Sequence, residues 1–175
     1  MRLIKPLLIG IIGLSLVVTF ISLLLPSEAH GRRGVVINAA KENVLVQIND
    51  FANWKHWHPD FAADSSKISY GKVTSGIDGS CDLKRANGRT DHYKFSSYND
   101  TAVVVIQQRA GENDIKNIFT LVQDASSSGT YTDWKMITKL KWYPWEKFSG
   151  FFTESFAAPG MELALDNLKS YSERQ

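Results

Sequence analysis

The sequence predicts an α+β domain in which a curved antiparallel sheet of about seven strands wraps around a long C-terminal helix, preceded by one N-terminal transmembrane helix. Three observations predict this architecture: an uncharged apolar run at residues 6–27, short strand patterns separated by turn residues over 66–142, and apolar side chains at helical spacing over 148–168. The 175 residues, 43% hydrophobic and 22% charged, suit one globular domain with its own core.

The uncharged run lies between Lys5 and Glu28 and consists mostly of Leu, Ile and Val. As a helix, its 22 residues would extend roughly 33 Å at about 1.5 Å per residue, enough to cross a hydrocarbon core of about 30 Å. We therefore expect residues 6–25 to span a membrane. This divides the chain into a transmembrane signal anchor at residues 1–29 and a folded domain at residues 30–175.

A cleaved signal peptide is the alternative for the same segment. Arg2 and Lys5 provide a basic N-terminal flank, and Ser27 and Ala29 put small residues at the minus three and minus one positions of a cleavage site. The apolar run is longer than the roughly 7 to 15 residues of a signal peptide, which favours the anchor.

The orientation of the anchor depends on the basic residues at its two ends. Arg2 and Lys5 precede the span and Arg32 and Arg33 follow it, so the positive charges nearly balance. A short N-terminal flank followed by a long apolar run is typical of a signal anchor. We therefore expect a single-pass membrane protein with its domain on the extracytoplasmic side.

The composition argues against several classes of function. Twenty Lys and Arg against eighteen Asp and Glu give a net charge of +2, which disfavours nucleic acid binding. The single cysteine, Cys81, lacks a partner for an intramolecular disulfide and the spacing of a metal motif, so it is interpreted as an ordinary strand residue. No nucleophile elbow, phosphate loop, dinucleotide turn or zinc helix motif occurs. We expect no cofactor and no catalytic residue, so an enzyme is the less favoured class.

The histidines do not form a recognisable metal site. His56 and His58 are two residues apart after a short helical segment, so they point in different directions, and no motif places a third ligand. His92 follows Asp91 directly, and a histidine beside a carboxylate is the pair of residue types found in an oriented general base. With Tyr93 facing inward, however, the two-residue period of a strand puts His92 on the outer face.

The first elements of the domain follow from short local patterns. Residues 35–37 are three β-branched residues in a row, which predicts a strand. Asn38 is a suitable N-cap for a helix that begins near Ala39. A short helical turn comes next and is ended by Pro59. The apolar residues of that turn are Phe51, Trp54 and Trp57.

An antiparallel meander should follow, because strand patterns alternate with turn formers such as Asn87-Gly88 and the segment 126–129. The predicted strands are 66–73, 80–85, 91–98, 102–109, 117–122 and 132–142. On the last strand one face is apolar and the other carries lysines, so the sheet needs a cover on one side. The residues of the apolar face are Trp134, Met136, Thr138, Leu140 and Trp142.

The C-terminal segment supplies that cover as a long amphipathic helix. Pro159-Gly160 lies inside it, which predicts a kink or break near Ala158. Its apolar residues are Phe148, Phe151, Phe152, Phe156, Met161, Leu165 and Leu168.

Two segments resemble the SRPBCC, or START-like, superfamily, which includes the polyketide cyclase/dehydrase-like proteins. They are VVINAAKENVLVQINDFANWKHWHPDF, which resembles the N-terminal signature, and FFTESFAAPGMELALDNLKSYSE, which resembles the closing helix. The resemblance covers roughly residues 35–173 and implies a helix-grip fold. It also implies a cavity between sheet and helix that holds lipids, polyketides or other apolar molecules, with catalysis in only some members. Ala39-Ala40 stands where Ala-Pro is usual.

The concave face of such a sheet leaves space beneath a single helix, so we expect a ligand-sized apolar cavity. The sequence therefore favours a membrane-tethered START-like domain that binds an apolar small molecule or lipid, and it identifies no protein partner. One alternative is a polyketide cyclase- or dehydratase-like enzyme, which needs a polar group with a displaced pKa in the cavity. Another is a protein-interaction domain with a collapsed cavity. The pocket candidates are Trp57, Leu83, Tyr93, Phe95, Trp134, Met136, Thr138, Phe152 and Phe156.

Overall fold

The computed structural model describes residues 4–63, 67–123 and 129–175. Arg2, the predicted strand start at Ser66 and most of the predicted turn at 126–129 lie outside the described residues. The elements are α1 (Ile4–Leu23), β1 (Glu28–Ile37), α2 (Lys41–Ile48), α3 (Phe51–Trp54), α4 (Pro59–Ala63), β2 (Ile68–Tyr70), β3 (Ser80–Lys84), β4 (Thr90–Tyr98), β5 (Ala102–Arg109), β6 (Ile115–Gln123), β7 (Thr130–Lys139) and α5 (Pro144–Ser172).

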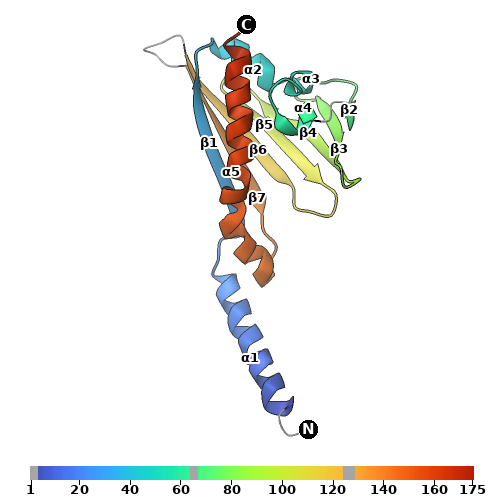
Figure 1. The fold of residues 1–175 in the computed structure, drawn as a ribbon, viewed down its shortest axis with the longest axis vertical. Coiled ribbons are helices and arrows are strands. Elements are labelled where there is room, and N and C mark those ends of the chain that lie inside the picture. Colours follow the sequence, from blue (N-terminus) through green and yellow to red (C-terminus); the bar gives the residue numbers. More distant parts are fainter. Residues whose placement is uncertain (1–3, 64–66, 124–128) are drawn as a thin grey trace.

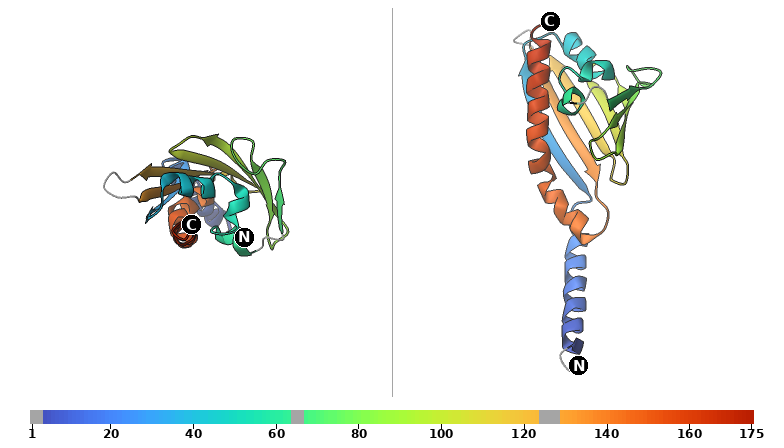
Figure 2. Two further views of the ribbon diagram at one scale, coloured as in Figure 1. Left: turned by 90° about the horizontal axis from the view of Figure 1, so that it is seen from above. Right: turned by 45° about the vertical axis from the view of Figure 1, so that its right-hand side comes forward.

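The strands form one antiparallel sheet in the order β1-β7-β6-β5-β4-β3-β2. Strand β1 returns to pair with the last strand, from Glu28 opposite Lys139 to Ile37 opposite Thr130. A register shift between Phe95 and Ser97 marks a bulge in β4, which increases local twist. Figures 1 and 2 show the sheet curving around α5, with α2, α3 and α4 closing one end of its concave side. The predicted α+β architecture is confirmed.

The core lies between the concave face of the sheet and the helices. Trp54 and Trp57 are almost completely buried at its centre. Their indole N–H groups donate to the backbone oxygens of Ile48 (2.8 Å) and Gln47 (3.1 Å), so both rings are fixed as well as buried. The two tryptophans brace the α2–α4 segment against the sheet.

Strand β1 and helix α4 differ from the prediction. Strand β1 begins at Glu28 and has ten residues, whereas the predicted strand covers only residues 35–37. Its pairing with β7 includes glycines and arginines, which have no alternating strand pattern in the sequence. Pro59 begins α4 as well as ending the preceding turn. The first helical position suits proline, since its missing N–H has no helical partner there.

Strand β7 is shorter than predicted. It ends at Lys139. Leu140 still lies on the side of α5, where its side chain is next to Gly150, whereas Trp142 is 63% exposed and does not continue the apolar face. The chain turns there toward Pro144, which opens α5.

Helix α5 continues through Pro159 without a break, although its ribbon changes direction along its length (Figure 1). The proline removes a single backbone donor, which bends a helix without ending it when the rest is packed. After Pro159, Met161, Leu165 and Leu168 are buried against the sheet. Before it, the aromatic side chains are largely exposed, so only the second half of α5 covers the core in the expected way.

Helix α1 projects away from the domain (Figure 1). Among the described residues it is the one helix long and apolar enough to cross a membrane, with a mean hydropathy of 2.4. These properties fit both a membrane anchor and a signal sequence. The junction with the domain is ordered by Lys147, a buried lysine whose ammonium group donates to the oxygen of Pro26 (3.1 Å) and to Oγ of Ser27 (2.7 Å).

Candidate functional site

A groove runs between the concave face of the sheet and α5. It consists of an inner cavity of about 250 Å³ beside α4 and an outer cavity of about 460 Å³ beside the first half of α5. The two cavities share part of their walls and therefore lie side by side along the groove. The shared residues are Arg109, Ile115, Met136, Phe156 and Ala157.

One wall of the inner cavity is apolar and aromatic. Trp54 and Trp134 are buried at this wall, and Met136 and Met161 contribute flexible thioether side chains beside them. The indole N–H of Trp134 donates to Oδ1 of Asn117 (3.1 Å), which leaves the ring face turned to its apolar neighbours.

The opposite wall carries a charged network centred on Arg85. The guanidinium contacts the carboxylate of Asp60 through Nη1 (2.9 Å) and that of Asp91 through Nη2 (2.8 Å). Gln107 also donates to Asp91 (2.9 Å), so this buried carboxylate is compensated by a charge and a hydrogen bond. Arg85 donates further to the hydroxyl of Tyr93 (3.3 Å). Because that hydroxyl accepts from Arg85 and burial raises its pKa, Tyr93 keeps a proton that it can donate into the cavity.

His58 lies at the same cavity and is 9% exposed. Its ring stacks on Trp54, with 5.2 Å between centroids and 9° between planes. Burial lowers the pKa of His58 to about 4 from an ordinary value of 6.5, while Asp60 opposes the shift and Arg85 adds to it. The imidazole is therefore neutral at pH 7. Its Nδ1 is closed off from solvent and has no hydrogen-bond partner among the described residues, so it is an unsatisfied polar atom within the wall.

The outer cavity is mainly apolar, with a polar rim on one side. Phe152 and Phe156 of α5 face Met136 of β7 across it. The hydroxyl of Thr138 donates to the backbone oxygen of Asp114 (3.0 Å). At the rim, the side-chain amide of Asn113 donates to the carboxylate of Glu146, and this contact joins the loop before β6 to α5.

The nine pocket candidates separate into two groups. Six of them line the groove: Tyr93, Trp134, Met136, Thr138, Phe152 and Phe156. The structure does not bring the other three to the groove wall. Trp57, Leu83 and Phe95 lie in the closed core, where Phe95 stacks on Phe51 at 4.2 Å between centroids.

Apart from Tyr93, the polar wall was not identified from the sequence, because its members come from α4, the segment after β3, β4 and β5. For two of these residues, Asp91 and Gln107, the sequence does predict the face of the sheet on which they lie. Asp91 precedes the inward Tyr93 by two residues and Gln107 follows the inward Val105 by two, so strand alternation places both on the concave face. Alternation does place His92 correctly on the outer face, where it contacts Asp82 of the neighbouring strand (2.6 Å).

The described residues contain no cluster of three His, Cys, Asp or Glu able to hold a metal ion. Cys81 is buried, and burial raises the pKa of its thiol to about 12. A thiol with so high a pKa is a poor nucleophile at neutral pH.

No family model matches the chain, and no curated protein matches it. Solved structures do match its fold. XoxI from Bacillus cereus aligns with a TM-score of 0.60 at 15% identity, over 82% of this chain and 94% of that one. CalU16 from Micromonospora echinospora gives 0.56 at 15%, over 83% and 84%. DynU16, a protein of the dynemicin biosynthetic locus, gives 0.59 at 13%, over 83% of this chain and 47% of its own length. At these identities the likeness establishes the fold alone, and it agrees with the helix-grip fold that the sequence resemblance implies.

Proposed function

We propose that the chain is a membrane-tethered domain of the SRPBCC, START-like type that binds an amphipathic small molecule or lipid. The apolar part of the ligand occupies the outer cavity and its polar head reaches the inner one. One observation carries this assignment: an apolar groove ends at a polar wall that contains neutral His58 and the network of Arg85 with Asp60 and Asp91.

The dimensions and lining of the groove support a small-molecule ligand. The two cavities, about 250 and 460 Å³, compare with the roughly 300–1,000 Å³ of typical ligand sites. Met136, Phe152 and Phe156 provide an apolar surface for an alkyl or polyketide-like chain. An open groove of this size argues against the collapsed-cavity alternative.

The polar wall selects the head group. The carboxyl group of Asp60 lines the inner cavity and can accept a hydrogen bond, and Tyr93 can donate one from its hydroxyl. A hydroxyl group both donates and accepts, so an alcohol, phenol or enol satisfies both side chains at once. We therefore favour a hydroxylated apolar ligand over a pure hydrocarbon.

A cyclase- or dehydratase-like enzyme is the second candidate function, and buried His58 with its displaced pKa is the observation that favours it. The occurrence of DynU16 in a biosynthetic locus is consistent with such chemistry on this fold. A pKa of about 4 makes His58 a weak general base at neutral pH, however, which is why binding is our first choice.

Helix α1 provides the tether in this proposal, through residues 6–25, with the domain on the extracytoplasmic side. Its 20 residues and high hydropathy support a span, and the ordered Lys147 junction supports an uncleaved chain in which α1 stays part of the folded protein.

Thermal unfolding of the full chain in lipid nanodiscs, with a panel of hydroxylated and non-hydroxylated alkyl and aromatic compounds, tests the binding function. A ligand at a hundredfold excess over its Kd stabilises the folded state by about 2.7 kcal/mol, which raises Tm measurably. Thr138→Phe, which fills the outer cavity, should abolish the rise. Thr120→Phe on the outer face of β6 is the matched control and should keep it.

The same samples separate binding from catalysis. Mass spectrometry of the compounds after incubation shows an unchanged ligand for a binding protein and a dehydrated or cyclised product for an enzyme. The binding proposal is refuted when no compound in the panel raises the Tm of the wild-type chain.

A further inference from the structure

The domain carries a band of exposed aromatic side chains, which we name the aromatic collar. Its members are Trp142 (63% exposed), Trp145 (70%), Phe148 (40%), Phe151 (60%), Phe152 (59%) and Phe156 (82%). Outside α1, every exposed Trp and Phe among the described residues belongs to this collar. Exposed apolar surface concentrated in this way marks an interaction site, because a monomeric soluble domain distributes such side chains singly.

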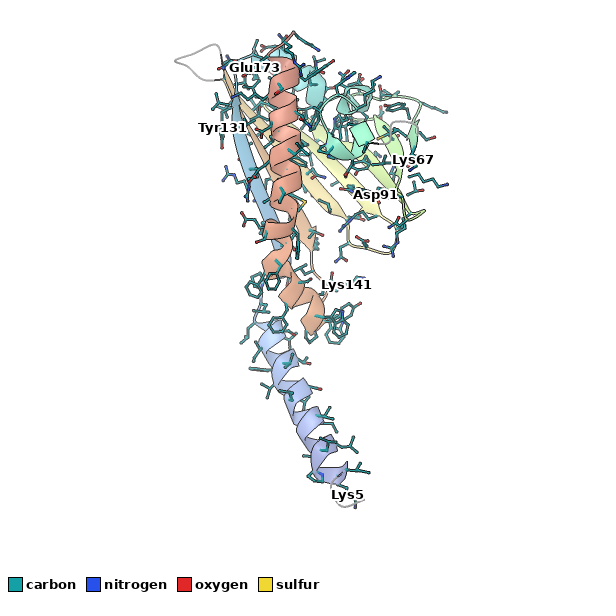
Figure 3. The ribbon with its side chains drawn as sticks, viewed as in Figure 1. Lys5, Lys67, Asp91, Tyr131, Lys141 and Glu173 are labelled. Carbon is teal, nitrogen blue, oxygen red and sulfur yellow. The ribbon has the colours of Figure 1, made fainter. Side chains whose placement is uncertain are left out.

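The collar lies at the end of the domain from which α1 departs. It occupies the link after β7 and the first half of α5, and Figures 1 and 3 show this part of α5 directly beside the C-terminal end of α1. Only residues 24–27 separate α1 from β1. The Lys147 contacts to Pro26 and Ser27 hold the start of α5 against that short link, so the collar and the end of α1 keep a fixed relation.

The length of α1 sets the depth of the collar. Its 20 residues extend about 30 Å, equal to the hydrocarbon core of a bilayer. If α1 spans the bilayer, Leu23 lies at one boundary of the core. The first turns of α5, held against residues 26 and 27 by Lys147, then lie at the level of the lipid head groups.

The chemistry of the collar fits that level. Tryptophan and tyrosine concentrate at membrane interfaces because their rings are apolar with one polar edge, and lysines extend their amines toward the phosphates. Tyr143 stacks on Trp145 with 4.9 Å between centroids, and the ammonium of Lys141 lies 5.9 Å from the Tyr143 ring. Lys139 and Lys141 are both exposed beside the aromatic residues.

We propose that the aromatic collar inserts into the interfacial layer of the same bilayer that α1 spans. The occupant of this surface is the lipid bilayer, because the surface is continuous with an apolar spanning helix and carries aromatic and lysine side chains together. The proposal depends on the proposed function only in that α1 is a membrane anchor.

Insertion has a direct consequence for the groove. Phe152 and Phe156 belong both to the collar and to the wall of the outer cavity. Insertion of the first turns of α5 brings the opening of the outer cavity close to the bilayer surface, so an amphipathic molecule has a short path between bilayer and groove.

Tryptophan quenching by brominated lipids tests the insertion. The full chain is reconstituted in nanodiscs of phosphatidylcholine and phosphatidylglycerol, with bromine atoms placed at shallow acyl positions. Trp54, Trp57 and Trp134 are buried in the domain, whereas Trp142 and Trp145 are exposed in the collar. We expect brominated lipid to quench the tryptophan emission of the wild-type chain. The double variant Trp142→Phe, Trp145→Phe should lose that quenching.

A matched control uses the opposite end of β7. Tyr131 is exposed there, far from Lys141 and the collar in Figure 3. Tyr131→Trp, added to the double variant, provides an exposed indole that brominated lipid should leave unquenched. Equal quenching of the Tyr131→Trp indole and of the collar tryptophans overturns the proposal, because it shows quenching without insertion.

The remaining outcomes are also decisive. If the chain co-elutes with nanodiscs and its collar tryptophans are unquenched, the membrane anchor is supported and the collar proposal is overturned. A dimeric mass in the same sample then indicates that a second copy of the chain covers the collar. A chain that does not co-elute with nanodiscs overturns the anchor and, with it, insertion of the collar.

Discussion

Acidification should destabilise the domain through His58. This side chain is 9% exposed, stacks on Trp54 and has a buried Nδ1 without a described partner. Protonating it in the folded state would place a positive charge near Arg85, in a site with little water. The unfolded chain has no such restriction and takes up the proton freely.

The size of the effect follows from the two pKa values. The pKa of His58 is about 4 in the folded protein against 6.5 for the free side chain. Because the folded value is the lower one, the unfolded state binds the proton first. The stability is complete above about pH 6.5 and is lost as the pH falls toward 4. At pH 5 the loss is about 2 kcal/mol, since one pKa unit corresponds to about 1.4 kcal/mol.

Urea unfolding of the full chain in a non-ionic detergent, followed by tryptophan fluorescence at pH 7.5 and pH 5, measures this loss. Other groups also titrate in this range, so the decisive quantity is the difference between wild type and His58→Gln. His56→Gln, at an exposed histidine of the same turn, is the matched control and should keep the wild-type pH dependence. An identical pH dependence in wild type and His58→Gln would refute the buried, neutral imidazole.

Three further predictions use the same or simpler measurements. Trp57→Ala should lower the free energy of unfolding by about 3–5 kcal/mol, because it leaves a large void in the closed core, and an unchanged Tm would contradict this packing. Arg85→Met should cost about 3 kcal/mol by leaving Asp91 buried without its cation. Arg89→Met, at an exposed ion pair, should cost less than about 1 kcal/mol, and equal costs would argue against the network. The full chain should stay in the membrane fraction during alkaline carbonate washing with Lys5 still present; a soluble form that begins after the apolar run would show cleavage instead.

The sheet could be predicted from the sequence because strand alternation is a local signal. In β4, Asp91, Tyr93 and Phe95 are buried while the residues between them face outward, as a two-residue period requires. The boundaries of β1 could not be predicted in the same way. Its pairing partner is β7, more than ninety residues away along the chain, and that long-range contact makes a strand of residues with weak intrinsic preference.

The site was predictable only on its apolar side. Trp134 and Met136 follow from the alternation of β7, whereas the polar wall requires α4, the segment after β3, β4 and β5 to meet in space. The exposed Phe152 and Phe156 show a different limit. An amphipathic helix has the same pattern whether its apolar stripe faces a protein core or a lipid interface, so periodicity predicts the stripe without identifying what it contacts.

The groove remains open because α5 presents small residues where it crosses the inner cavity. Ala157 and Gly160 line that cavity, and a Cβ added at Gly160 would meet nothing within 4 Å. One turn later the same face carries Ala164 and Leu165, which are buried against the sheet. Helix α5 therefore closes the core with its second half and leaves space beside Pro159. Phe156 and Met161 also line that cavity, so the space depends on the two small residues between them: Leu or Phe at position 157 or 160 would occupy it.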